Sequence, residues 1–112
     1  MLNVTVRRSQ WLRGSNDSKL YRSSDRRMCC LGFACKAAGL STGDILNKRT
    51  PNDIQHHLPK TLEKLADGEN TNVCLYLMDI NDERDVSAAK RESQLKKLGK
   101  TAGLRFKFVG KG

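Results

Sequence analysis

Apolar and polar residues alternate at both ends of the chain. Apolar side chains occupy every second position over residues 2–7 and again over residues 104–108. Because side chains two apart share one face of a β-strand, each pattern predicts a half-buried strand with one apolar and one polar face. Residues 19–22 follow a stretch rich in glycine, serine and asparagine, and predict a short partner strand after a turn.

A longer apolar run indicates a second kind of strand. Residues 73–80 are apolar on both faces of an extended chain, which is typical of a central strand covered on two sides or nearly so. Together with the terminal strands and the short strand, this run predicts a small sheet of three to four strands, mainly antiparallel.

Helical patterns fill most of the remaining chain. Residues 27–38 carry apolar or small side chains around nearly the whole helix circumference before Gly39, which predicts a buried, cysteine-rich central helix. A capping box at 41–44 and a Thr-Pro start at 50–53 indicate two shorter helices. Residues 86–98 predict a longer helix with a narrow apolar face.

These elements predict one compact α+β domain over residues 1–112, with the helices packed on one face of the sheet. A chain of 112 residues is too short to bury a second core. No apolar run approaches the roughly 18 residues that a membrane span requires. The start of the chain also lacks the order of residues typical of a signal peptide. We therefore expect a cytoplasmic protein that has no membrane partner.

Charge changes this picture because it is strong and uneven. The chain has 21 Lys and Arg against 12 Asp and Glu, a formal net charge of +9. Residues 1–27 carry +5, residues 28–85 carry −3 and residues 86–112 carry +7. If the two terminal segments lie side by side, they form one positive surface that attracts phosphates or an acidic protein.

The predicted partner-binding residues are cations on the terminal elements and one aromatic side chain. They are Arg7, Arg8, Trp11, Arg13, Lys90, Lys97, Lys100, Arg105 and Lys107. Phosphate contacts need only such cations, since they are independent of sequence. No helix-turn-helix, zinc-finger or RNA-recognition signature is present, and aromatic residues for base stacking are few. The other interpretation is a charged exterior that keeps a small protein soluble.

The cysteines cluster instead of spreading along the chain. Three of the four lie in the predicted helix at 27–38, and Cys74 lies in the predicted central strand. A disulfide framework would space them more widely, so we expect reduced thiols.

The same cluster leaves an enzymatic alternative open. A thiol at a helix N-terminus beside arginines has a lowered pKa, so Cys29 or Cys30 could act as a nucleophile. His56 or His57 would then be the base of a cysteine hydrolase or transferase. Against this, a cysteine in a helix that is apolar all round is usually a small buried hydrophobe.

The spacing of residues does not support a metal site, a phosphate-binding loop or a serine nucleophile. The chain has no C-x-x-C pair, and the acidic stretch at 79–85 lacks the glycine and distal glutamate of a calcium loop. Phosphate-binding glycine loops and the serine nucleophile elbow are also missing. We therefore expect no metal, no cofactor and no enzymatic activity.

Four short motifs give the chain a resemblance to known sequences. These are R-S-Q-W-L-R-G at 8–14, M-C-C-L-G-F at 28–33, M-D-I-N-D at 78–82 and R-E at 91–92, followed by the closing strand. In this combination the chain resembles small uncharacterised proteins encoded by phages and prophages, over most of its length. The resemblance implies a genomic context more than a reaction.

By analogy, small phage accessory proteins act by binding, for instance as inhibitors of host defence complexes such as CRISPR effectors, as modulators of host enzymes or as nucleic-acid binders. The leading hypothesis is therefore a non-enzymatic phage-type accessory protein. Its basic surface, with Trp11 as an anchor, would bind an acidic host protein complex or nucleic acid.

Overall fold

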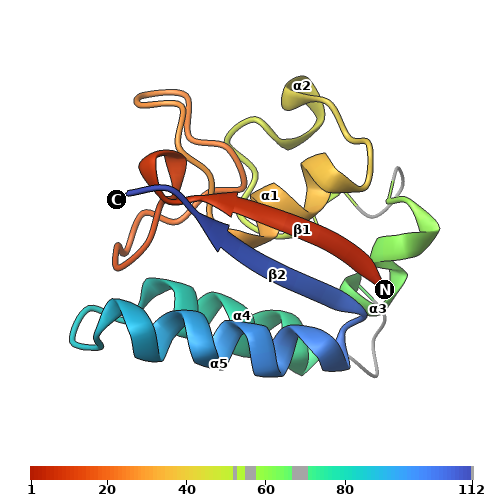
Figure 1. Ribbon diagram of the computed structural model, residues 1–112. Helices are drawn as coiled ribbons and strands as arrows, with labels where there is room; N and C mark the ends of the chain where they lie inside the picture. The colour runs from red at the N-terminus through yellow and green to blue at the C-terminus, as the bar shows by residue number, and fades with distance from the viewer. Residues whose placement is uncertain (52, 55–57, 67–70, 112) are drawn as a thin grey trace.

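The computed structural model describes residues 1–51, 53–54, 58–66 and 71–111 (Figure 1). It has two strands, β1 (Leu2–Arg7) and β2 (Leu104–Val109). The helices are α1 (Cys30–Ala37), α2 (Thr42–Ile45), α3 (Glu63–Ala66), α4 (Thr71–Asp82) and α5 (Ala88–Thr101). Short 3-10 turns cover Arg8–Gln10 and Lys60–Leu62. No helix in the described part of the chain is long and apolar enough to cross a membrane.

The sheet is a two-stranded parallel ribbon, so the prediction of three to four mainly antiparallel strands is wrong. β1 and β2 pair in register from Leu2 with Leu104 to Arg7 with Val109. Parallel strands must enter the sheet from the same end, and the chain between β1 and β2 supplies the long crossover this requires. Residues 19–22 form only isolated bridges, outside the sheet.

The apolar run at 73–80 forms most of helix α4, so the predicted central strand is also wrong. Cys74, Leu77 and Asn81 recur at helical spacing and are buried, whereas Leu75 and Tyr76 are 47% and 56% exposed. A strand buried on both faces would have no place for two exposed neighbours. The period of the buried side chains is therefore helical.

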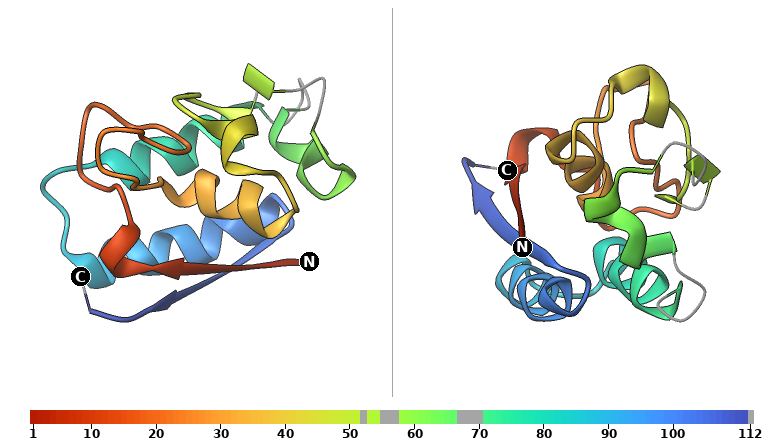
Figure 2. Two further views of the ribbon diagram at one scale, coloured as in Figure 1. Left: turned by 90° about the horizontal axis from the view of Figure 1, so that it is seen from above. Right: turned by 90° about the vertical axis from the view of Figure 1, so that its right-hand side faces the viewer.

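The helices cover one face of the sheet, and the α+β mixture of the prediction is confirmed. Figure 2 shows β1 and β2 at one side of the molecule, with α1 behind β1 and α5 behind β2. Val4 and Val6 of β1, with Phe106 and Phe108 of β2, point into the core. The opposite face of the sheet carries mostly polar side chains, and none of the described helices covers it (Figure 1). Parallel sheets usually have both faces covered, so this open face is unusual.

α1 is the buried centre of the fold, as predicted. Every residue from Cys30 to Cys35 is buried. The helix begins at an N-cap, Cys29, and ends before Gly39, whose φ of +99° is the left-handed conformation that closes many helices. Gly32 lets the Leu20 carbonyl lie directly against the helix, since a Cβ at this position would stand 1.8 Å from that oxygen.

The shorter helical elements agree in part with their predicted starts. The capping box at Ser41 is confirmed, because the Ser41 hydroxyl accepts from the Asp44 N–H while the Asp44 carboxylate accepts from the Ser41 N–H. Of the predicted start at 50–53, Asn52 lies outside the described residues. Asp53 does accept hydrogen bonds from the N–H groups of Arg49 and Thr50.

α5 starts two residues later than predicted and continues to Thr101. Its buried positions are Arg91, Leu95 and Gly99, whereas Ala88 in the first turn is exposed. Gly99 lies against the Phe106 ring, where a Cβ would come within 2.7 Å of a ring carbon. This close approach brings the backbone of α5 onto β2.

Candidate anion-binding surface

The open face of the sheet carries cations from both ends of the chain. Register places Thr5 beside Lys107 and Asn3 beside Arg105, on the face away from the core, and Arg7 is exposed at the end of β1. The structure describes every residue of the two strands, and none of their outward positions is acidic. The condition for one joined positive surface, that the terminal segments lie side by side, is therefore met.

A lysine-lined groove on α5 is a further positive site of the C-terminal segment. The groove has a volume of about 510 Å³, and it is bordered by Lys96, Lys97 and Lys100 with Glu92. Lys96 lies beside the core side of β2, because its ammonium is 6.0 Å from the centroid of the Phe108 ring, which points away from the open face. Lys90 is exposed about two turns before Lys97 on the same helix. We call the exposed cations of the sheet and the groove the basic face; they are Arg7, Arg105, Lys107, Lys96, Lys97 and Lys100.

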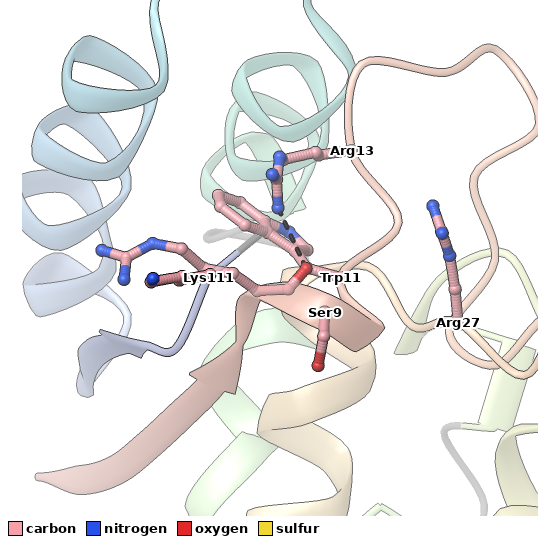
Figure 3. Close-up of a pocket in the computed structure, with 6 residues that line it drawn as sticks. Ser9, Trp11, Arg13, Arg27 and Lys111 are labelled. Atoms are coloured by element: carbon pink, nitrogen blue, oxygen red, sulfur yellow. Dashed lines mark hydrogen bonds between the residues drawn. The ribbon is translucent and has the colours of Figure 1, made fainter.

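A second positive site, the arginine pocket, lies where the two strands end. Figure 3 shows this pocket, which has a volume of about 300 Å³ and is lined by Arg8, Ser9, Trp11, Arg13, Arg27 and Lys111. Arg8 directly follows β1, and Lys111 follows β2 by two residues. In Figure 3 the Arg13 guanidinium lies over the indole of Trp11, Arg27 stands across the pocket, and the Ser9 hydroxyl points away from the indole.

The loop that carries Trp11 and Arg13 is held by Asn81, at the C-terminal end of α4. The Asn81 side-chain oxygen accepts from the Trp11 indole N–H at 2.8 Å and from the Cys30 N–H at 3.1 Å. Its amide donates to the Leu12 carbonyl at 2.9 Å. One buried side chain therefore joins α4, the start of α1 and the loop after β1.

Trp11 belongs to the core, which corrects its predicted role as an exposed anchor. It is 2% exposed, and its ring centroid lies 4.8 Å from that of Phe108. The position of Trp11 among arginines predicted an exposed side chain that is free to contact a partner. Its hydrogen bond to Asn81 instead satisfies the indole inside the protein. Trp11 acts on the surface through Arg13, whose guanidinium carbon lies 4.7 Å from the ring centroid.

Arg8 is also not the free surface cation that the sequence predicted. Its Nε and Nη2 donate to the two carboxylate oxygens of Glu92 at 2.8 and 2.7 Å, and its Nη1 donates to the Gly110 carbonyl at 2.8 Å. The hydrogen bonds and charge of Arg8 hold the pKa of Glu92 below its usual range. Arg8 thus ties the end of β1 to α5 and to the segment after β2.

Arg13 lies in positive surroundings. Its pKa is lowered, first by burial and next by the neighbouring charge of Arg91, with further contributions from Arg8 and Arg27. Glu92 opposes these effects. Neighbouring cations disfavour the charged form of Arg13, and an added anion would stabilise that form.

The motifs of the sequence meet at this site. Gly14 of the first motif donates its N–H to the Asn81 carbonyl, Cys30 of the second binds the Asn81 side chain, and Glu92 of the last binds Arg8. No protein-family model, curated protein or solved structure matches the chain. The resemblance to small phage-encoded proteins stays a prediction.

The thiols are placed as core residues. Cys29, Cys30, Cys35 and Cys74 are all buried and unpaired. Burial raises the pKa of Cys29 to about 11, and it also raises the pKa of Cys30 well above its ordinary value. A thiolate at neutral pH, which the enzymatic alternative needs, is therefore disfavoured. Its predicted bases, His56 and His57, lie outside the described residues. Within the described part of the chain, no cluster of three or more His, Cys, Asp or Glu side chains could hold a metal.

The cations of the basic face were mostly identified from the sequence, whereas the pocket was not. Arg7, Lys90, Lys97, Lys100, Arg105 and Lys107 are exposed, as predicted. Arg27 and Lys111 were not predicted to bind a partner, because Arg27 was assigned to the start of the buried central helix and Lys111 follows the last predicted strand. Their neighbour Arg13 follows β1 by six residues, so only the folded loop brings these cations together.

Proposed function

We propose that the protein is a non-catalytic nucleic-acid-binding protein that holds a sugar-phosphate backbone on its basic face. The observation that carries this proposal is the parallel pairing of β1 with β2, which joins the two basic ends of the chain on a sheet face that no described helix covers. Phosphate contacts dominate the affinity of such interactions and require no base-specific side chains.

The spacing of the cations supports a backbone ligand. Arg105 and Lys107 are two positions apart on β2, so they project on the same side of the strand, roughly 6.6 Å apart. Arg7 lies on the same face of the neighbouring strand β1, and the groove on α5 supplies three more lysines. A regular row of cations suits a regular row of phosphates better than it suits an irregular cluster of carboxylates on a protein.

The absence of aromatic side chains from the described basic face supports binding without sequence preference. Trp11 is buried, and the ring of Phe108 is on the core side of β2. Base stacking therefore contributes little here, and we expect the protein to contact phosphates and sugars instead of bases.

A salt titration tests the proposal. The probes are a fluorescein-labelled single-stranded DNA, its duplex and the matching RNA, and the measurement is fluorescence anisotropy. With about four phosphates contacted, log Kobs should fall against log salt with a slope near −3, which is about 50-fold between 50 and 200 mM salt. The proposal would be overturned if the protein bound none of the probes at low salt, or if Kobs did not change with salt concentration.

A competitor distinguishes the other class of partner. If a polyglutamate peptide displaces the DNA at a lower concentration of negative charge than unlabelled DNA does, the basic face serves an acidic protein, such as a host defence complex. That result would replace nucleic acid as the proposed partner.

A further inference from the structure

The arginine pocket differs from the basic face in shape and in charge density. Its volume of about 300 Å³ equals the space of roughly ten water molecules. None of the described residues that line it is acidic. A small concave site among several cations suits one compact group of high negative charge, whereas the open sheet suits an extended chain.

Arg8 builds the pocket without supplying its free charge. All three nitrogens of its guanidinium are engaged, with Glu92 and with the Gly110 carbonyl. Three other cations remain, namely Arg13, Arg27 and Lys111. Within the described residues neither Arg13 nor Lys111 forms an ion pair, and the Arg27 Nε lies 3.8 Å from an Asp25 oxygen.

Arg13 is already oriented for a ligand. Its guanidinium rests on the Trp11 ring, and its Nη1 donates to the Arg8 carbonyl at 3.3 Å. Trp11 is itself held by Asn81 and Phe108. A planar guanidinium on a fixed ring loses little rotamer freedom when it binds, and its fork matches two oxygens of a phosphate.

The position of the pocket connects it to the basic face. β1 ends at Arg7, on the basic face, and the next residue, Arg8, already lines the pocket. β2 leads to Lys111 in the same way. Ligand sites of parallel sheets lie beyond the carboxyl ends of the strands, and this pocket occupies that position. A strand held along the sheet would reach it with one of its ends.

We infer that the arginine pocket binds the terminal phosphomonoester of a nucleic-acid strand whose backbone lies on the basic face, an inference that rests on the proposed function. A terminal monoester carries a charge of about −1.5 to −2 at neutral pH, against −1 for each internal phosphodiester. Arg13, Arg27 and Lys111 can match this extra charge. The pKa of Arg13 is lowered first by burial and then by neighbouring cations, and a bound dianion would offset the second of these effects.

The test compares single-stranded DNAs of one sequence, about 12 nucleotides long, that differ only at their ends. One has a 5′-phosphate, one a 3′-phosphate and one hydroxyls at both ends, and each carries an internal fluorophore. At about 150 mM salt and neutral pH, we expect one end-phosphorylated form to bind about tenfold more tightly than the hydroxyl form. The preferred form identifies which end enters the pocket.

A paired variant locates the preference. Arg27→Gln with Lys111→Gln removes two exposed cations of the pocket and leaves the Trp11–Asn81 contact intact. This variant should bind the phosphorylated and hydroxyl forms equally. Lys48→Gln with Arg49→Gln removes the same charge from exposed positions that do not line the pocket, and should keep the preference.

The outcomes separate this inference from the proposed function. If all three DNAs bind equally to the native protein, the pocket inference fails while backbone binding stands. If none binds, both fail. A preference that persists in the Arg27→Gln, Lys111→Gln variant also overturns the inference. So does a phosphoserine peptide that competes better than the end-phosphorylated DNA, because the pocket would then serve a protein.

Discussion

Asn81 connects three separate parts of the chain: helix α4, the start of α1 and the loop after β1. Its side chain accepts from Trp11 and Cys30 and donates to Leu12, and its own carbonyl accepts from the Gly14 N–H. The side chain is completely buried, so water cannot replace these partners. Each buried polar group left without a partner costs roughly 1–3 kcal/mol.

The substitution Asn81→Ala tests this role. It leaves the indole N–H of Trp11, the Cys30 N–H and the Leu12 carbonyl without their partner. We expect the free energy of unfolding to fall by about 3 kcal/mol or more, as measured by urea denaturation. Asp79→Ala, an exposed position on the same helix, is the control and should change stability by less than about 0.5 kcal/mol. Equal effects would show that Asn81 is not the connecting residue.

Sequence reasoning could not assign these partners at the residue scale. Trp11 and Asn81 are 70 positions apart, and nothing local to Trp11 indicates burial. The cysteines show the opposite case. The burial of Cys29, Cys30 and Cys35 followed from a predicted helix that is apolar around nearly its whole circumference, and that property is visible in the sequence alone.

At the scale of elements, the terminal strands were predictable because alternation has a period that only one structure fits. The parallel pairing of those strands was not predictable, because it depends on the path of the chain between them, and no local pattern shows that path. Helix α4 was mistaken for a strand because its apolar run at 73–80 is too continuous to show a period. Only the exposure of Leu75 and Tyr76 separates the two structures.

Helix α1 depends on a close approach at Gly32. A methyl group there would stand 1.8 Å from the Leu20 carbonyl, which belongs to the loop packed across the helix. We expect Gly32→Ala to lower the free energy of unfolding by about 3 kcal/mol, the upper range for overpacking. Gly43→Ala is the matched control in α2, where the nearest atom to a new Cβ is the Ser41 hydroxyl at 3.7 Å. Thermal unfolding of both variants decides the point, and a Gly32→Ala protein as stable as the control would contradict the packing described.

At the scale of the whole molecule, the fold brings the two basic ends of the chain together on one surface. The +5 and +7 segments are the first 27 and last 27 residues of the chain, and they meet only because β1 and β2 pair. The acidic middle segment supplies α1 to α4, behind the sheet (Figure 2). Arg7, Arg105 and Lys107 therefore come together on the outward face of the sheet, which none of the described helices covers.

Two variants of equal net charge test the central claim, that binding depends on where the positive charge lies. Arg105→Gln with Lys107→Gln removes two cations from the basic face, and Lys48→Gln with Arg49→Gln removes two from the middle segment. The measurement is the affinity for single-stranded DNA across a salt series. We predict that the first variant binds about tenfold more weakly with a salt slope shallower by about 1.4, while the second binds within about twofold of the native protein. Equal losses in both variants would contradict the account, because total charge and not the paired strands would then explain binding.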